Sequence, residues 1–167
     1  MIYAFDTYYY ENYAYTVCLA FKDWADDLET AAYSEKTPVT SEYESGAFYK
    51  RELPCILSLL SKIDLKNGDI LLVDGYVTLN NEGKIGLGGY LYEKLEEKYP
   101  VVGIAKNEFS APDSQRRTIY RGESKTPLFL TSKGVDVDFL KNKIEKMHGL
   151  YRIPTLLKKL DQLTRIA

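Results

Sequence analysis

The stretch Asp69-Ile-Leu-Leu-Val-Asp-Gly75 decides how this chain is interpreted. Its central residues, Ile70 to Val73, form a short continuous apolar run, which is typical of a strand buried on both faces of a sheet. Asp74 follows at the carboxyl end of that strand, and Gly75 allows the backbone to turn sharply there. Because α/β proteins bind ligands at the carboxyl ends of their strands, Asp74 is a candidate functional residue. An ordinary turn aspartate is the alternative reading of this stretch alone.

The composition is that of an ordinary globular protein. With 167 residues, of which 45% are hydrophobic and 28% charged, we expect a single domain over residues 1–167 with a sizeable core. No apolar run approaches the length of a membrane span, and the sequence starts with a strand-like segment instead of a signal peptide. Cys18 and Cys55 stand in apolar surroundings without metal-ligand spacing. We therefore expect reduced core cysteines and a cytoplasmic protein.

Charge is distributed unevenly along the chain. The net charge of −2 argues against a general nucleic-acid binder. However, residues 107–167 contain 12 Lys and Arg against 7 Asp and Glu, whereas residues 1–106 contain 10 against 17. Such a split allows a basic face beside an acidic pocket, and an uneven solvated surface is equally compatible with it. Tyr8, Tyr9 and Tyr10 could stack on bases, although most tyrosines should be half-buried strand residues.

Apolar runs, turn residues and prolines predict strands alternating with helices. In chain order, the expected elements are strands over 2–9, 13–21 and 29–34, a polar loop over 36–45, an extended segment over 47–53, a helix over 54–63, the strand over 70–73, a helix ending near 99, a strand over 101–105, a hairpin of 118–121 with 128–131, a helix over 137–147 and a last helix from 154. The first helix is placed from Pro54, because proline is favoured at the first helical position. Glu52 then stands just before that helix.

Three meandering strands followed by alternating helices and strands are typical of the ribonuclease H-like fold. We therefore predict an α/β fold with a mixed sheet, three antiparallel strands and then parallel strands, flanked by helices. In that arrangement an aspartate on the first strand, a glutamate by the first helix and an aspartate ending the fourth strand converge. Asp6, Glu52 and Asp74 occupy those positions.

Converging carboxylates indicate a divalent metal site. Close like charges repel strongly in a partly desolvated site, and a hard cation such as Mg²⁺ or Mn²⁺, which prefers oxygen ligands, relieves that repulsion. Such an ion activates water and stabilises both the attacking and the leaving oxygen of a phosphodiester. Asp6, Glu52 and Asp74 are accordingly predicted to act in catalysis.

Lys106 is the fourth predicted catalytic residue. It ends the apolar strand over 101–105, which should run parallel to the strand ending in Asp74, so its ammonium should approach the same edge of the sheet. A lysine there can hold a carboxylate or the scissile phosphate and stabilise developing negative charge. An exposed lysine at a strand end is the alternative.

Ordered motifs over nearly the whole chain resemble those of a known family. The motifs are Phe5-Asp6, the segment Gly46 to Glu52 ending in Arg51-Glu52, Leu72-Val-Asp-Gly75, Val102-Gly-Ile-Ala-Lys106, Arg121-Gly-Glu-Ser-Lys-Thr-Pro-Leu-Phe-Leu-Thr-Ser132, Tyr151-Arg-Ile-Pro154 and Asp161. On these residues the chain resembles endonuclease V, a metal-dependent nuclease that nicks strands near deaminated bases such as inosine. The Val-Asp-Gly and Gly-Ile-Ala-Lys pair is the strongest part of this resemblance.

The resemblance implies an endonuclease of DNA repair or RNA processing, acting with Mg²⁺ or Mn²⁺ on DNA or RNA that is single-stranded or locally opened. The family's metal ligands correspond to Asp6 and Asp74, with Glu52 beside them. Asp161 falls where the family has a further aspartate or histidine, so it is expected to complete the site. The residues expected to contact nucleic acid are Tyr43, Gly46, Arg51, Gly75 and Arg121.

Some loops depart from the family pattern. The family's Pro-Tyr-Ile-Pro wedge, which separates strands at the lesion, reads Glu42-Tyr-Glu-Ser45 here and keeps only Tyr43. The two added carboxylates would repel DNA phosphates. The family's His-Pro-Arg run after the Asp-Gly is replaced by Asn80-Asn-Glu-Gly-Lys84. These departures motivate a second hypothesis, a non-catalytic or substrate-diverged endonuclease V-like protein that binds a nucleotide or a partner.

Overall fold

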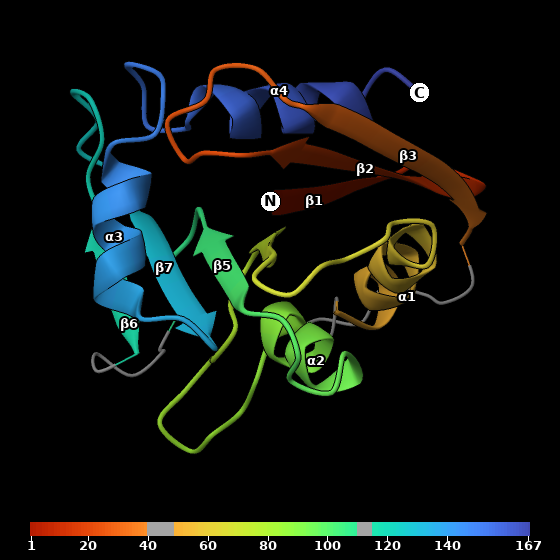
Figure 1. Ribbon diagram of the computed structural model, residues 1–167, viewed down its shortest axis with the longest axis horizontal. Coiled ribbons are helices and arrows are strands. Elements are labelled where there is room, and N and C mark those ends of the chain that lie inside the picture. The colour runs from red at the N-terminus through yellow and green to blue at the C-terminus, as the bar shows by residue number, and fades with distance from the viewer. Residues whose placement is uncertain (40–48, 110–114) are drawn as a thin grey trace.

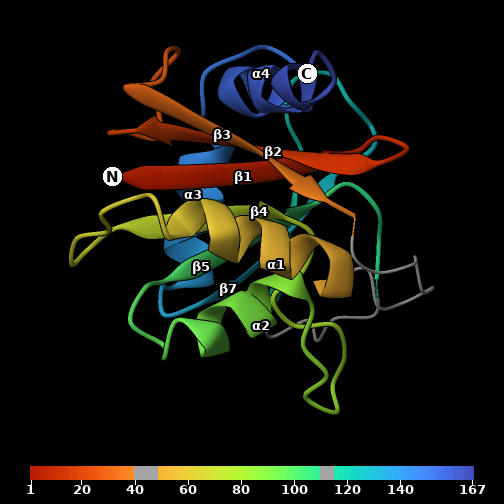
Figure 2. The same cartoon turned by 90° about the vertical axis from the view of Figure 1, so that its right-hand side faces the viewer.

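The structure, a computed structural model, describes residues 1–39, 49–109 and 115–167. Within these residues, seven strands and four helices form one mixed sheet with helices on both faces (Figures 1 and 2). The elements are, in order, β1 (Ile2–Tyr9), β2 (Tyr13–Phe21), β3 (Ala31–Pro38), α1 (Tyr49–Leu60), β4 (Ile70–Asp74), α2 (Leu87–Lys94), β5 (Val101–Ala105), β6 (Arg116–Ile119), β7 (Leu128–Lys133), α3 (Val137–Glu145) and α4 (Thr155–Thr164).

The sheet has the strand order β3-β2-β1-β4-β5-β7-β6. β1, β4 and β5 are parallel neighbours, whereas β2 and β3 on one side and β7 and β6 on the other pair antiparallel. The predicted α/β fold, a ribonuclease H-like mixed sheet with three antiparallel strands followed by parallel ones, is therefore confirmed. The central position of β1, β4 and β5 brings their carboxyl ends to one edge of the sheet.

Alternating side chains on the central strands build two cores, one on each face of the sheet. Ala4 on β1 and Leu72 on β4 belong to the core beneath α3 and α4, whereas Phe5, Leu71 and Val73 belong to the core beneath α1 and α2. Figure 2 shows α4 on one side of the sheet and α1 and α2 on the other. The strand predicted from the apolar run is thus buried on both faces, as expected. Even-numbered residues of β1 and β4 point toward α4 because strand side chains alternate.

The first helix and the third strand differ from their predicted bounds. α1 begins at Tyr49, so Pro54 lies inside the helix and Glu52 lies in its first turn instead of before it. The buried residues Leu53, Ile56 and Leu59 have helical spacing, and their packing outweighs the one backbone hydrogen bond that the proline removes. β3 continues to Pro38, into the predicted polar loop, because an edge strand tolerates proline.

Three other elements are shorter or shifted. α2 ends at Lys94, well before the predicted end near residue 99, and Glu96 and Glu97 follow with positive φ values of 57° and 60°. α3 ends at Glu145, two residues before its predicted end, and Met147 beyond it is buried. β6 covers residues 116–119, two residues earlier than expected at both ends. The order and type of all these elements are as predicted.

The segment Glu42 to Ser45, with the predicted nucleic-acid contacts Tyr43 and Gly46, lies outside the described residues. None of the helices in the described ranges is both long enough and apolar enough to cross a membrane.

Candidate active site

Asp6 and Asp74 lie side by side at the carboxyl ends of two parallel strands. The register of β1 and β4 places Phe5 beside Val73, so the next residue of each strand, Asp6 and Asp74, comes level with the other. Both are even-numbered positions and share the α4 face of the sheet. The sequence pattern therefore predicted their convergence correctly.

Lys106 extends the same arrangement from β5. Residues Val102 and Ile104 of β5 join the core beneath α4, so Lys106, two residues further, is directed to the same face. Its Nζ lies 3.6 Å from Oδ2 of Asp74, with 42% of the lysine side chain and 43% of the aspartate side chain exposed. An ion pair this exposed is weak, so the ammonium remains accessible to a further anion.

Glu52 approaches the same point from α1, on the opposite face of the sheet. It is only 5% exposed, and its Oε1 has no hydrogen-bond partner among the described residues. Burial raises the pKa of Glu52 well above its usual 4.5, and the charges of Asp6 and Asp74 raise it further. A buried carboxylate oxygen without a partner is expensive, which makes this position a candidate for a ligand.

Asp161 completes the group from α4. Its carboxylate lies 3.4 Å from Nε of Arg165, one helical turn further along. Its charge contributes to the raised pKa of both Asp6 and Asp74. The four carboxylates thus come from four separate elements, β1, α1, β4 and α4.

The two aspartates on the strands have raised pKa values. Burial raises the pKa of Asp6 from 3.8 to about 6, with contributions from Asp74 and Asp161, while Lys106 and the Thr7 N–H that donates to Asp6 Oδ1 act against the rise. Burial also raises the pKa of Asp74, against the opposing charge of Lys106. Perturbed carboxyl groups that gather in a cleft are typical of functional sites.

Two cavities meet at these residues. A cavity of about 370 Å³ opens at the carboxyl ends of β1, β4 and β5, next to α1 and the start of α2. A smaller cavity of about 40 Å³ lies between the strands and α4. Asp6, Asp74 and Lys106 line both cavities, whereas Glu52 lines only the larger one and Asp161 only the smaller one. The carboxylates therefore surround the floor of an open cleft that is large enough for a small organic group.

The oxygen atoms gathered at the cleft are of the type that binds a hard divalent cation. Four carboxylates with little countercharge, one of them with a buried unpartnered oxygen, are the oxygen ligands that Mg²⁺ and Mn²⁺ prefer. Within the described ranges, no three acidic, histidine or cysteine side chains lie close enough together to enclose an ion. Asp6, Glu52, Asp74 and Asp161 surround such a position without closing on it.

Two glycines make the cleft possible. Gly75 has a φ of +133°, a conformation that residues with side chains rarely adopt, and its N–H donates to the carbonyl of Ile104 at 3.0 Å. A Cβ on Gly103 of β5 would lie 2.5 Å from the carbonyl oxygen of Gly75. The Val-Asp-Gly and Gly-Ile-Ala-Lys motifs therefore allow the backbones of two neighbouring strands to approach closely beneath the cleft.

Neither of the two arginines predicted to contact nucleic acid lines the cleft. The guanidinium of Arg51 lies 4.0 Å from the centre of the Tyr9 ring and lines a separate cavity of about 140 Å³. Arg121 is 4% exposed and donates to the carbonyls of Met147, Gly149 and Tyr151. The contact predicted for Arg121 is corrected, because its guanidinium is buried and already used to fix a loop.

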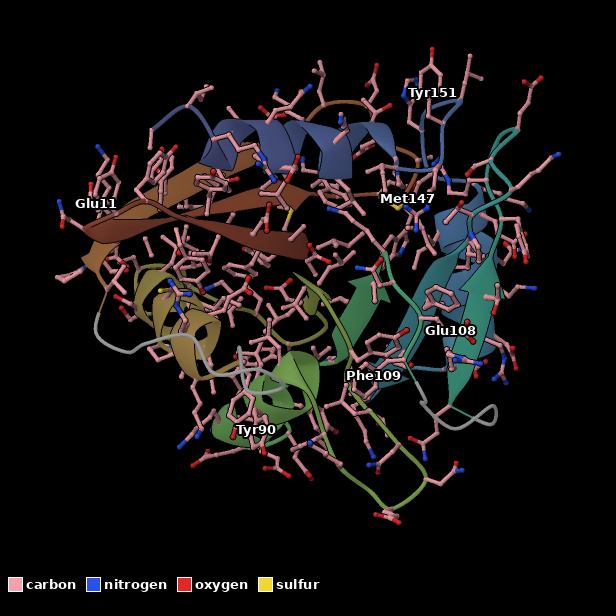
Figure 3. All side chains as sticks on the ribbon, turned by 180° about the vertical axis from the view of Figure 1, so that it is seen from behind. Glu11, Tyr90, Glu108, Phe109, Met147 and Tyr151 are labelled. Atoms are coloured by element: carbon pink, nitrogen blue, oxygen red, sulfur yellow. The ribbon has the colours of Figure 1, made fainter. Side chains whose placement is uncertain are left out.

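Aromatic residues at the rim of the larger cavity were not predicted. The Tyr76 hydroxyl donates to the carbonyl of Asn107 at 2.8 Å and accepts from the N–H of Phe109 at 2.9 Å. This ties together the loops that follow β4 and β5, and Phe109 is 48% exposed beside the cleft (Figure 3). The available signal was their position, since Tyr76 follows Gly75 directly and Phe109 stands three residues after Lys106.

The comparison with protein families identifies the chain. The model of the endonuclease V family matches residues 1–151, so the chain belongs to the endonuclease V family. No curated protein is significantly similar to it in sequence.

Several solved structures share the fold. Endonuclease V from Bacillus subtilis is 18% identical, with a TM-score of 0.72 over 99% of this chain and 78% of that one. Ciona intestinalis endonuclease V, in complex with a 23mer DNA containing an inosine followed by a ribo-adenosine, is 15% identical, with a TM-score of 0.74 over 98% and 83%. The catalytic domain of human endonuclease V is 20% identical, with a TM-score of 0.70 over 98% and 80%. At these identities the similarity establishes the fold.

Proposed function

We propose that the protein is a divalent-metal-dependent endonuclease that hydrolyses a phosphodiester bond of nucleic acid near a deaminated base such as inosine. The main support for this proposal is that Asp6, Glu52 and Asp74 come from three elements to one cleft. A buried oxygen of Glu52 has no hydrogen-bond partner among the described residues. Membership of the endonuclease V family and the inosine-containing DNA named for the Ciona intestinalis complex support the substrate class.

Each residue of the cleft has a role in this proposal. Asp6, Asp74 and Glu52 would hold Mg²⁺ or Mn²⁺, with Asp161 completing the ligands from the α4 side and Glu52 also orienting the attacking water. Bound there, the ion would supply a nucleophilic hydroxide and stabilise charge on the leaving oxygen. The ammonium of Lys106, exposed and 3.6 Å from Asp74, would hold the non-bridging oxygens of the phosphate as negative charge develops.

The larger cavity offers space for a nucleobase next to the cut bond. It reaches from Asp6 and Asp74 to the aromatic rim formed by Tyr76 and Phe109, and its volume of about 370 Å³ lies within the range of small-molecule pockets. An extruded base could lie against these rings while its phosphates stay at the carboxylates. Base extrusion is how enzymes commonly reach a base within a duplex.

The direct test is cleavage of inosine-containing DNA and RNA oligonucleotides in Mg²⁺ or Mn²⁺. Wild-type protein should nick at least one of them near the inosine, and Asp74→Ala should not. Asp64→Ala serves as a matched control, because that aspartate is 83% exposed and comes before β4, whose opposite end carries Asp74. A wild type without activity, or equal cleavage by Asp74→Ala, would exclude the proposed function.

The second candidate is a non-catalytic endonuclease V-like protein. The open arrangement of the described carboxylates and the acidic replacement Glu42-Tyr-Glu-Ser45 favour it. The two candidates differ in metal binding, because a ligand that binds only the native state raises its melting temperature. A large rise in Tm with Mn²⁺ that Asp6→Ala abolishes would count against the non-catalytic candidate.

The cellular setting is part of the same proposal. Cys18 and Cys55 are buried free thiols, which supports a reducing, cytoplasmic location. In that location the activity would serve DNA repair or RNA processing.

A further inference from the structure

Two large apolar side chains stand exposed on the loop that leads into α4. Leu150 is 82% exposed and Tyr151 is 78% exposed, next to Met147, which is buried. Figure 3 shows Tyr151 extending outward from this loop. Exposed apolar side chains next to one another on a small protein commonly mark a binding surface.

The loop is held rigidly although its tip is exposed. Arg121 donates to the carbonyls of Met147, Gly149 and Tyr151, at 2.6, 3.1 and 2.8 Å. Gly122, with φ of +58°, lies so close to the Leu150 carbonyl that no side chain would fit there. Ordering a loop costs conformational entropy, so a loop fixed beforehand presents its side chains for binding at lower cost.

A basic groove begins at Tyr151. It has a volume of about 570 Å³, and three of its lining residues are the cations Arg152, Lys158 and Lys159, whereas none is a carboxylate. Lys159 is paired with Glu29 at 2.7 Å, and Arg152 donates to the neutral carbonyls of Lys106 and Pro127, so the contacts of Arg152 leave its charge uncancelled. Lys158 is exposed.

The groove adjoins the candidate active site. Ile153 lines both the groove and the small cavity of Asp6, Asp74 and Asp161. Lys158 stands three residues before Asp161 on α4, which is about one helical turn. A strand whose phosphate lies at the carboxylates could therefore continue past Ile153 into the groove at the start of α4.

We infer that Tyr151 and the groove bind a single-stranded segment of nucleic acid that flanks the cut bond, with the Tyr151 ring stacked on a base and Lys158 contacting a phosphate. This inference rests on the proposed function for its choice of substrate. Charge complementarity with a polyanion and an exposed aromatic beside cations are the features by which proteins bind single strands without reading their sequence. Leu150 extends the apolar surface next to the stacked base.

The test separates stacking from charge. A fluorescent single-stranded oligonucleotide without inosine is titrated by anisotropy over a series of salt concentrations, with no divalent metal present. Tyr151→Ala should weaken binding about tenfold at fixed salt and leave the salt dependence unchanged, while Tyr151→Phe should bind like wild type. Lys158→Ala should lower the slope of log affinity against log salt by about 0.7, as expected for one lost phosphate contact on a single strand.

Matched controls lie elsewhere on the molecule. Phe139→Ala removes an aromatic on α3 that is 49% exposed, and Lys94→Ala removes an exposed lysine on α2, across the sheet from α4 (Figure 2). Both should bind like wild type. The Tm of each variant is measured alongside, and the 78% exposure of Tyr151 predicts no loss of stability from its truncation.

The outcomes distinguish this inference from the proposed function. If the wild type cleaves inosine-containing strands but Tyr151→Ala and Lys158→Ala bind the oligonucleotide like wild type, the inference is wrong and the proposed function stands. If binding depends on both residues and no cleavage occurs, the groove is a binding surface and the proposed function fails. If the protein neither binds the oligonucleotide nor cleaves inosine-containing strands, both the inference and the proposed function are excluded. A dimer that Tyr151→Ala dissociates, with oligonucleotide binding unchanged, would assign the surface to a second copy of the chain and overturn the inference.

Discussion

The two ends of β4 carry the same residue type in opposite circumstances. Asp69, just before the strand, is 5% exposed and accepts the backbone N–H of Lys66 at 2.7 Å and the ammonium of Met1 at 3.0 Å. Asp74, at the other end, has Lys106 at 3.6 Å, and burial, with a contribution from the charge of Asp161, raises its pKa. Asp69 stabilises the fold, whereas Asp74 is held in place at a cost to stability. Such a cost is typical of a functional site.

The largest effect is expected from Asp74→Ala, which should lower the single-turnover rate of cleavage by at least about a thousandfold. Removing a metal ligand forfeits several kcal/mol of transition-state stabilisation, and each 1.36 kcal/mol is a factor of ten in rate. Asp69→Asn keeps the shape at the other end of β4 and should cleave at the wild-type rate at 25 °C. If Asp74→Ala and Asp69→Asn lose cleavage rate equally, the two ends of β4 do not differ in function.

Lys106→Ala should lower the cleavage rate by about a hundredfold, as for the loss of one group that stabilises developing charge. Lys106 is 42% exposed, so its removal should change the free energy of unfolding little. Lys133→Ala, at the exposed end of β7, is the control for a lysine at a strand end. If Lys106→Ala cleaves at a rate within twofold of wild type, Lys106 is an ordinary exposed lysine at a strand end and has no role in catalysis.

Asp69→Ala should lower the free energy of unfolding by about 2 kcal/mol, because it removes a buried carboxylate that accepts from the Lys66 N–H and from the Met1 ammonium. Urea unfolding of the metal-free protein measures this loss. The same measurement on Asp74→Asn should show no loss. A destabilised Asp74→Asn with an unaffected Asp69→Ala would reverse the assignment of structural and functional roles.

Asp6→Asn should raise the stability of the metal-free protein at pH 7.5 by about 1–2 kcal/mol. The pKa of Asp6 is about 6 in the folded protein and near 3.9 in an unfolded chain, so the folded state binds the extra proton between these values. The contribution of Asp6 to wild-type stability therefore falls as pH rises from about 4 to 6, and the advantage of the asparagine is complete above pH 6. Near pH 4 the two proteins should unfold at the same urea concentration. If the difference in stability is the same at pH 4 and pH 7.5, it does not arise from the ionisation of Asp6.

The sequence was most informative where a residue's place follows from strand periodicity. A buried apolar strand with a polar residue at its carboxyl end fixes both the strand and the direction of the last side chain, so Asp6, Asp74 and Lys106 could be placed together. Their mutual arrangement depends only on register and alternation, which are properties of the backbone.

The sequence was less informative where packing decides. The start of α1 was misplaced because Pro54 is a local signal, whereas Leu53, Ile56 and Leu59 bury a helical face across the whole element. Arg121 was misassigned because a motif does not reveal whether a guanidinium faces solvent or the carbonyls of a loop distant in sequence. Tyr76 and Phe109 were missed because the hydrogen bonds between their loops form only in the folded chain.

The central inference, that Asp6, Glu52 and Asp74 share a divalent ion, is tested most directly by titrating metal-free protein with Mn²⁺ in a calorimeter. Wild type and Asp69→Asn should bind Mn²⁺ with the same affinity, whereas Asp74→Asn and Glu52→Gln should bind at least about tenfold more weakly. Undiminished Mn²⁺ binding by Asp74→Asn, or no binding by the wild type, would contradict it.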